Sequence, residues 1–98
     1  MIVHIVMFKF NEEKKKTNIL RVKDALEGLV KKIPELKCLE VGIDFNQSER
    51  AFDLSLYATF NTKDDLKAYT THPVHLEVVA LIKSVTSESK VVDYEVTN

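Results

Sequence analysis

Both faces of the first predicted strand are apolar, and this constrains the fold more than any other feature of the sequence. Residues 2–10 are rich in β-branched and aromatic side chains, which is typical of a β-strand. The odd positions include Val3, Ile5 and Met7, and the even positions hold Ile2, His4, Val6, Phe8 and Phe10. A strand with two apolar faces needs cover on both sides. We therefore expect it to lie at the centre of a sheet whose two faces are both covered.

A long amphipathic helix is expected directly after this strand. Asn11, followed by Glu12 and Glu13, is suited to cap a helix start and to place acids in its first turn. Pro34 ends the pattern. Between about residues 14 and 33 the apolar side chains recur at the spacing of one helix face, at Ile19, Val22, Leu26, Leu29, Val30 and Ile33.

The second half of the chain predicts a hairpin, a broken helix and a last strand. Alternating patterns over residues 36–45 and 52–60 indicate the hairpin. Thr62 and Asp65 form a capping box for a helix through about Thr71, Pro73 opens a second helical segment, and residues 91–96 close the chain as a strand. The β-α-β-β-α-β order predicts one α+β domain over residues 1–98. It is a ferredoxin-like sandwich with both helices on one face and the second helix broken near His72-Pro73.

The sheet face that the helices leave open predicts self-association. An exposed apolar patch usually marks an interface, and twofold dimers are the commonest oligomers. The same face of the third strand carries polar side chains, so the interface is expected to be mixed. These are Asp53, Ser55, Tyr57 and Thr59.

Composition disfavours several other classes of partner. Lys plus Arg number 14 and Asp plus Glu 15, and this mixed charge predicts neither nucleic acid nor anionic membrane as a partner. The apolar start of the chain is too short to span a membrane and lacks the features of a signal peptide. The single cysteine, Cys38, has no partner for an intrachain disulfide. We expect a cytoplasmic protein.

Three side chains are candidates for acid–base chemistry. If Pro73 is the first helical residue, His75 is the third, where the positive end of the helix dipole favours a neutral imidazole that accepts a proton. Tyr69 ends the preceding helical piece, and His4 sits in the central strand on the face that the helices cover. Two imidazoles and a phenol around a mostly apolar space suit a small organic ligand.

A purely structural role accounts for the same residues. His4 is then a hydrogen-bonded core histidine, His72 a helix-stop residue, His75 a surface residue at a helix start, and Tyr69 a packing residue. A zinc site is disfavoured, because the sequence has no H-E-x-x-H motif or cysteine pair and His72 and His75 straddle a proline.

The chain resembles the stress-responsive A/B barrel (Dabb) domain family of the dimeric α+β barrel superfamily. The resemblance covers essentially the whole chain. It rests on His4-Ile-Val-Met-Phe8-Lys9-Phe10, Leu29-Val-x-x-Ile-Pro34, Asp53-Leu-Ser-Leu-Tyr-Ala-Thr-Phe60, Tyr69-x-x-His72-Pro73-x-His75 and Val92-Asp93-Tyr94. It implies a ferredoxin-like subunit whose sheet packs against that of a second copy.

The resemblance also implies candidate site residues. The catalytic residues of a cofactor-free plant polyketide cyclase of this family, olivetolic acid cyclase, match His4, Tyr69 and His75, and His72 matches a further pocket histidine. His75 would then remove a proton next to a ketone, Tyr69 would orient it or stabilise the enolate, and His4 would hold the carbonyl end. Where the cyclase has an aromatic residue and a glycine along its alkyl tunnel, this chain has Lys23 and Val79. The other residues expected to contact a ligand are Leu56, Ala58 and Val79.

We therefore expect a homodimer that binds a small, partly apolar carbonyl compound, with cofactor-free cyclase- or lyase-like proton transfer. One alternative is a non-catalytic stress-response or ligand-carrier dimer, and another is a cofactor-free monooxygenase. No cofactor is required. Some plant relatives look able to hold an incidental Mg²⁺ ion with backbone carbonyls that would correspond to those of Val30, Ile33 and Leu36.

Overall fold

The computed structural model describes residues 1–97 and has the ferredoxin-like order predicted from the sequence. Its four strands form one antiparallel sheet in the order β2-β3-β1-β4, so β1 is flanked on both sides. The elements are β1 (Ile2–Phe10), α1 (Lys15–Glu27), the 3₁₀ helix η1 (Gly28–Lys31), β2 (Cys38–Ile43), β3 (Leu54–Phe60), α2 (Lys63–Thr71), α3 (Pro73–Val85) and β4 (Thr86–Glu95).

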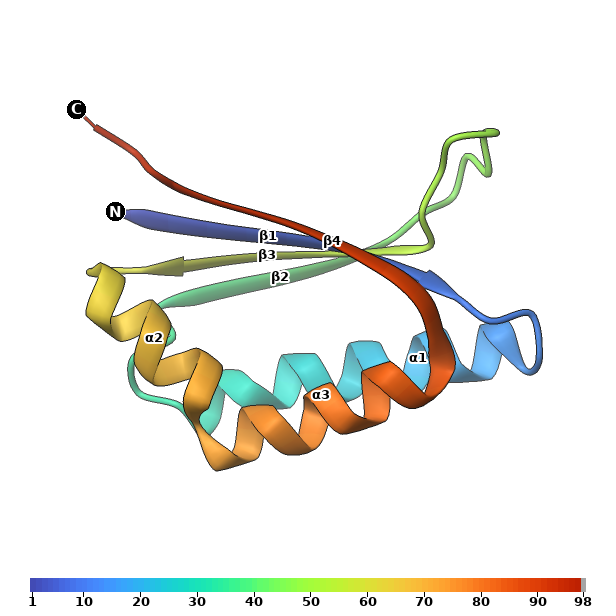
Figure 1. Ribbon diagram of the computed structural model, residues 1–98. Helices are drawn as coiled ribbons and strands as arrows, with labels where there is room; N and C mark the ends of the chain where they lie inside the picture. Colours follow the sequence, from blue (N-terminus) through green and yellow to red (C-terminus); the bar gives the residue numbers. More distant parts are fainter. Residues whose placement is uncertain (98) are drawn as a thin grey trace.

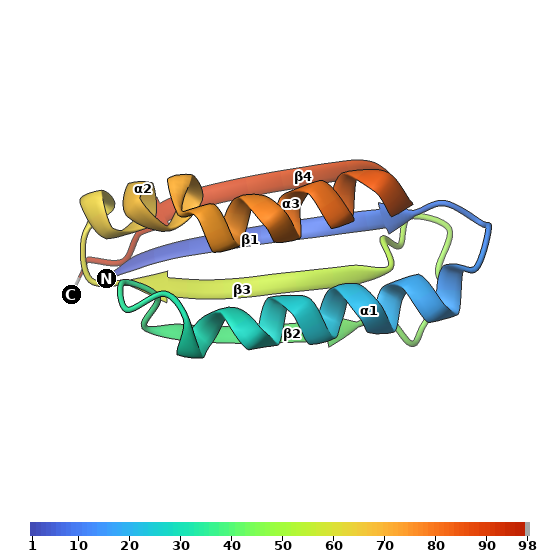
Figure 2. The same cartoon turned by 90° about the horizontal axis from the view of Figure 1, so that it is seen from below.

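The helices all lie on one face of the sheet, as Figure 1 shows. Seen from below in Figure 2, α1 runs along β2 and β3, whereas α3 runs along β1 and β4. The core fills the space between these two layers and includes the even-numbered apolar residues of β1. The largest fully buried side chains are Tyr69, Phe60, Leu26, Leu29, Ile33, Leu54, Val3 and Val22.

The opposite face of β1 is less exposed than its apolar sequence suggests. Val3 is buried and Ile5 is half-buried, while Met7 keeps 42% of its surface exposed. Further apolar side chains on this open face come from β4, where Val92 lies opposite Ile5 and Tyr94 lies opposite Val3. The open face is thus apolar toward β4, with Met7, Val92 and Tyr94 all exposed.

The start of the first helix differs from the prediction. Asn11 does not cap it: the residue before α1 is Lys14, in a left-handed conformation (φ 53°) and with no side-chain cap. The backbone N–H of Asn11 instead donates to the carbonyl of Val85 at 2.9 Å, which ties the β1–α1 loop to the end of α3. The helix also ends earlier than expected, at Glu27, and continues as η1.

The break in the second helical segment lies where the sequence predicts it. Thr62 caps α2 by accepting the Asp65 N–H at 3.1 Å. His72 has an extended backbone between α2 and α3, and Pro73 is the first residue of α3. His75 is therefore the third residue of a new helix, as expected.

The last strand starts earlier than predicted, at Thr86 and not at Val91. Its polar first half pairs with β1 from Thr86 opposite Phe10 onward, with an irregularity at Lys9 and Phe10. Backbone hydrogen bonds to β1, and not an apolar pattern, define this half of the strand. No helix in residues 1–97 is both long and apolar enough to cross a membrane.

Candidate functional site

Three aromatic rings from three different elements meet between the helices and the sheet. His4 comes from β1, Tyr69 from α2 and His75 from α3. The ring centroids of Tyr69 and His75 are 4.3 Å apart, and those of His4 and Tyr69 are 6.2 Å apart. Phe60 packs against the same cluster, with its ring centroid 5.1 Å from that of Tyr69. The Tyr69 ring therefore lies in contact range of both imidazoles.

His4 is oriented by a carboxylate on the neighbouring strand. It lies on the helix-covered face of β1 directly opposite Asp93 of β4, and its Nδ1 hydrogen-bonds to the Asp93 carboxylate. An anionic acceptor at Nδ1 fixes the tautomer that carries the proton there, so Nε2 is left with a lone pair. His4 is buried, whereas the Asp93 side chain is 45% exposed.

His75 is held in the same tautomer by the main chain. Its Nδ1–H donates to the carbonyl of Thr70 at 3.2 Å, which leaves the lone pair on Nε2. Burial lowers the pKa of His75 below its usual value of 6.5, and the nearby imidazoles His4 and His72 lower it further, against the effect of the Thr70 carbonyl. At neutral pH, His75 is thus an uncharged imidazole able to accept a proton.

Tyr69 differs from both histidines because its polar atom is unpaired. The side chain is fully buried, and its hydroxyl has no hydrogen-bond partner within the described part of the chain. Burial raises the pKa of Tyr69 to about 12, so the hydroxyl keeps its proton at neutral pH. It can donate a hydrogen bond to an oxygen, but it does not act as a base.

A groove of about 240 Å³ runs under α3 beside the two imidazoles. We call it the α3 groove. His4, His75 and Thr70 line one end. Lys83, Thr86 and Ser89 also line it. Its remaining walls are largely apolar and include Val6, Phe8, Leu26, Leu56, Val79 and Ile82.

The sequence and the fold both match a known family. The model of the stress responsive A/B barrel domain matches residues 2–96. The chain belongs to this family. A stress-response A/B barrel domain-containing protein from Arabidopsis thaliana is 33% identical over 96 residues, which cover 95% of this chain and 84% of that protein.

Solved structures share the fold of this A/B barrel domain. A dimeric protein of ferredoxin-like fold from Bacteroides fragilis is 33% identical, with a TM-score of 0.89 over 97% of this chain and 95% of that one. A hydroxynitrile lyase from Passiflora edulis is 21% identical, with a TM-score of 0.87 over 98% of this chain and 93% of that one. At that identity, the likeness to the lyase shows the shared fold alone.

The predicted ligand-contacting residues are only partly brought together in this A/B barrel domain. Leu56 and Val79 line the α3 groove. Ala58 is fully buried opposite His4 and is not among the lining residues. His72 also lies outside the lining: its Nδ1 accepts the Val74 N–H at 3.1 Å and caps α3. His72 thus lies between the two helices, as the C-cap of α2 and the N-cap of α3, in agreement with a structural role. Lys23 is absent from the lining as well, and it pairs with Glu27 at 2.6 Å.

Sequence reasoning missed the groups that orient the imidazoles. Asp93 was noted only as part of a family motif, and its pairing with His4 depends on the register of β1 and β4. The Thr70 carbonyl has no sequence signature. The sequence offers one signal for the contact between His4 and Asp93. An acid in the last strand lies on the same face of the sheet as a histidine of the central strand.

The segment predicted to bind an incidental Mg²⁺ ion is folded tightly. The Ile33 carbonyl accepts the Leu36 N–H at 3.1 Å, and both side chains are buried. Residues 1–97 contain no cluster of three or more His, Cys, Asp or Glu side chains able to hold a metal. Cation binding by the carbonyls of Val30, Ile33 and Leu36 stays a prediction.

Proposed function

We propose that this A/B barrel domain binds a small, partly apolar carbonyl compound in the α3 groove and catalyses cofactor-independent proton transfer on it. The observation that carries the proposal is the pair of imidazoles, His4 and His75. Each has its Nδ1 engaged by the protein, which leaves an Nε2 lone pair available. Both rings line the groove. Tyr69 is not among the lining residues, but its ring packs against both imidazoles and its hydroxyl is unpaired within the described part of the chain.

The chemistry follows from the protonation states of the three groups. The neutral His75 imidazole accepts a proton from the carbon next to the ligand carbonyl, and the electron pair of that C–H bond becomes an enolate. The protonated Tyr69 hydroxyl donates a hydrogen bond to the enolate oxygen, which requires the ligand to reach past the residues that line the groove to the buried Tyr69. His4, held by Asp93 with a lone pair on Nε2, orients the ligand by accepting a hydrogen bond from an enol or hydroxyl group of the ligand. The enolate then either takes the proton back from His75 at carbon, or its carbon attacks a second carbonyl of the same ligand, whose oxygen takes that proton to become a hydroxyl.

The test is α-proton exchange of hexane-2,4-dione in D₂O, followed by proton NMR. Wild-type protein is expected to accelerate exchange above the buffer rate, and His75→Ala to reduce the acceleration by about 10²- to 10⁴-fold. Lys16→Ala is the control, because Lys16 is exposed and lies outside the α3 groove, and it should leave exchange intact. Equal exchange by wild type and His75→Ala would contradict the proposal.

A non-catalytic carrier is the second candidate function. It is supported by the same hydrogen bonds, because Asp93 and Thr70 already satisfy one nitrogen of each imidazole without a ligand. A carrier would bind the dione, shift the histidine ring signals and leave its exchange rate unchanged. Oxygen uptake with a quinol substrate would instead favour the monooxygenase alternative, which stays a prediction.

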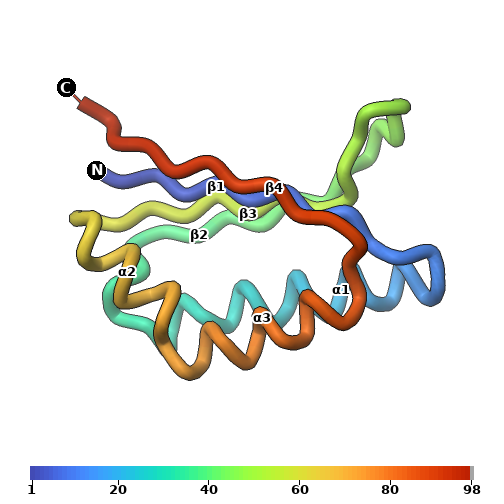
Figure 3. Tube along the Cα trace, viewed as in Figure 1, coloured from blue at the N-terminus to red at the C-terminus, as the bar shows by residue number. Residues whose placement is uncertain are grey.

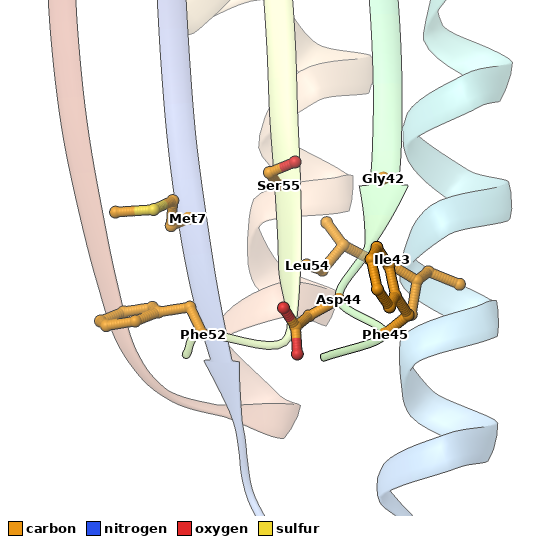
Figure 4. A pocket seen from close by; sticks show the side chains of 8 residues that line it. All are labelled: Met7, Gly42, Ile43, Asp44, Phe45, Phe52, Leu54 and Ser55. Carbon is orange, nitrogen blue, oxygen red and sulfur yellow. The ribbon is translucent and has the colours of Figure 1, made fainter. Parts of the chain in front are cut away.

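We also propose that two copies pair through the open face of the sheet. The segment between β2 and β3 bends away from the helices, beyond the open face (Figure 3), and carries Phe45, which is 94% exposed. At its base is a hollow of about 300 Å³ with Met7 and Phe52 on one side and Phe45 on the other (Figure 4). A second sheet would cover this apolar surface. Sedimentation as a dimer at micromolar concentration is expected, and a monomer would contradict the pairing.

A further inference from the structure

The α3 groove has polar groups at both ends, and the end away from the imidazoles is cationic. His75, Val79 and Lys83 follow one another at intervals of four residues, so they lie along the same side of α3. The separation of eight positions between His75 and Lys83 corresponds to roughly 12 Å along the helix axis. Lys83 therefore lines the groove about two helical turns away from the imidazole end.

Lys83 lacks a carboxylate partner of its own. Within residues 1–97 no Asp or Glu oxygen lies within 4.0 Å of its ammonium group, although four other lysines have such a partner. The carboxylates of the adjoining strand are already engaged, since Glu88 pairs with Lys90 at 3.2 Å and Asp93 pairs with His4. The charge of Lys83 is thus available to a ligand.

Ser89 adds a neutral donor to this end of the groove. It lies in β4 opposite Phe8, and its hydroxyl makes no hydrogen bond to any other described residue. Thr86 also lines this end, but its hydroxyl already donates to the Ile82 carbonyl at 2.8 Å. One ammonium and one free hydroxyl match the needs of a single carboxylate.

The section between the two ends is apolar. Val6, Leu56, Val79 and Val91 line it and offer no side-chain hydrogen-bonding group. The volume of about 240 Å³ lies below the range typical of drug-sized ligands, so the groove suits a small metabolite. A ligand that fills it would have two polar ends joined by a short apolar spacer.

We propose that the ligand is an oxo acid, with its carboxylate at Lys83 and Ser89 and its carbonyl at the imidazole end. The carbonyl half rests on the proposed function, whereas the carboxylate half rests on Lys83 and Ser89. A lysine in the last turn also complements the helix dipole. That role does not require its side chain to line a groove, and it predicts no preference between charged and neutral ligands.

The experiment compares 6-oxoheptanoate with its neutral analogue 6-oxoheptanamide. Dissociation constants are measured at low salt by NMR titration, following the ring signals of His4 and His75. Wild type is expected to bind the acid about tenfold more tightly than the amide, because a charge-assisted contact is lost in the amide. Raising the salt to about 0.5 M should narrow the difference.

Three variants assign the preference to Lys83. Lys83→Gln should bind the acid and the amide equally, with its amide affinity unchanged, and Lys83→Arg should keep the preference for the acid. Lys16→Gln removes the same charge from an exposed residue outside the groove and should behave as wild type. Superimposable backbone spectra would show that each variant is folded.

The outcomes separate this inference from the proposed function. If the amide moves the histidine signals and the acid binds no better, the carboxylate site is wrong and the carbonyl site stands. A preference for the acid that survives in Lys83→Gln would likewise refute the assignment of Lys83. If neither compound moves the ring signals, both proposals are overturned.

Discussion

Replacing Tyr69 with phenylalanine is expected to stabilise the protein, although Tyr69 is among the most buried residues. Its hydroxyl is inside the fold without a hydrogen-bond partner among residues 1–97. Burying such a group costs about 1–3 kcal/mol relative to water. The ring contacts with Phe60 and His75 remain in the variant. After allowing for the lost contacts of one oxygen, we expect a gain of about 1 kcal/mol in the free energy of unfolding.

Thermal and urea unfolding of wild type and Tyr69→Phe would measure this gain. About 1 kcal/mol corresponds to a rise of roughly 4–8 °C in Tm for a domain of this size. Protein concentration must be the same in both samples, because a dimer is stabilised by mass action. Tyr69→Leu is the control for ring packing and should lose about 1–3 kcal/mol. A loss of more than about 0.5 kcal/mol in Tyr69→Phe would refute the reasoning, because it would mean that the hydroxyl is hydrogen-bonded in the folded protein.

Three further outcomes test other parts of the structure. Because burial lowers the pKa of His75, the unfolded chain binds a proton at that residue more readily than the folded one. The contribution of neutral His75 to the free energy of unfolding should therefore be fully present above pH 6.5. It should be lost as the pH drops toward the lower pKa that His75 has in the folded protein. Urea titrations at several pH values should show a smaller fall in His75→Gln. Asp53→Ala should lower the free energy of unfolding in urea by about 1–3 kcal/mol, since the buried Asp53 carboxylate accepts the Phe10 N–H at 2.8 Å. Asp24→Ala, on the exposed side of α1, is the control and should change the free energy of unfolding little. Met7→Lys, which places a charge on the open face, should shift the sedimenting species from dimer to monomer.

The sequence predicts those parts of the fold that local patterns determine. Period-two and helical spacing give the order of the elements, and Pro73 gives the break in the second helix. The start of β4 could not be predicted, because residues 86–90 are polar, all but the half-buried Thr86 are solvent-exposed, and only their pairing with β1 defines them as a strand. Asn11 was expected to cap α1 because side-chain type suggests a cap. Its N–H is instead taken by the Val85 carbonyl, a contact 74 residues along the chain.

The candidate site divides in the same way. His4, Tyr69 and His75 could be placed near one another because each is fixed by a strand position or by the helix break. The hydrogen-bond partner of each imidazole determines which of its nitrogens carries the proton, and these partners depend on tertiary structure. The register of β1 and β4 puts Asp93 beside His4, and the turn between α2 and α3 puts the Thr70 carbonyl beside His75. Which lysines line the α3 groove also depends on how both long helices are rotated over the sheet. Lys83 of α3 lines the groove, whereas Lys23 of α1 does not.

The extended backbone at His72 explains how one short segment supplies both Tyr69 and His75. In a continuous helix, residues six positions apart point in directions that differ by about 120° around the axis, so the two rings would lie on different faces. The break lets their centroids approach to 4.3 Å. Pro73 and the His72 cap together maintain the break. Pro73 has no N–H to donate within a continuous helix, and the His72 side chain accepts the N–H of Val74. Replacing both with alanine should therefore favour a continuous helix and remove the NOEs between the Tyr69 and His75 rings. Pro73→Ala alone should keep them, since the cap remains. If the double variant retained the NOEs, packing against the sheet, and not the local break, would hold the two rings together.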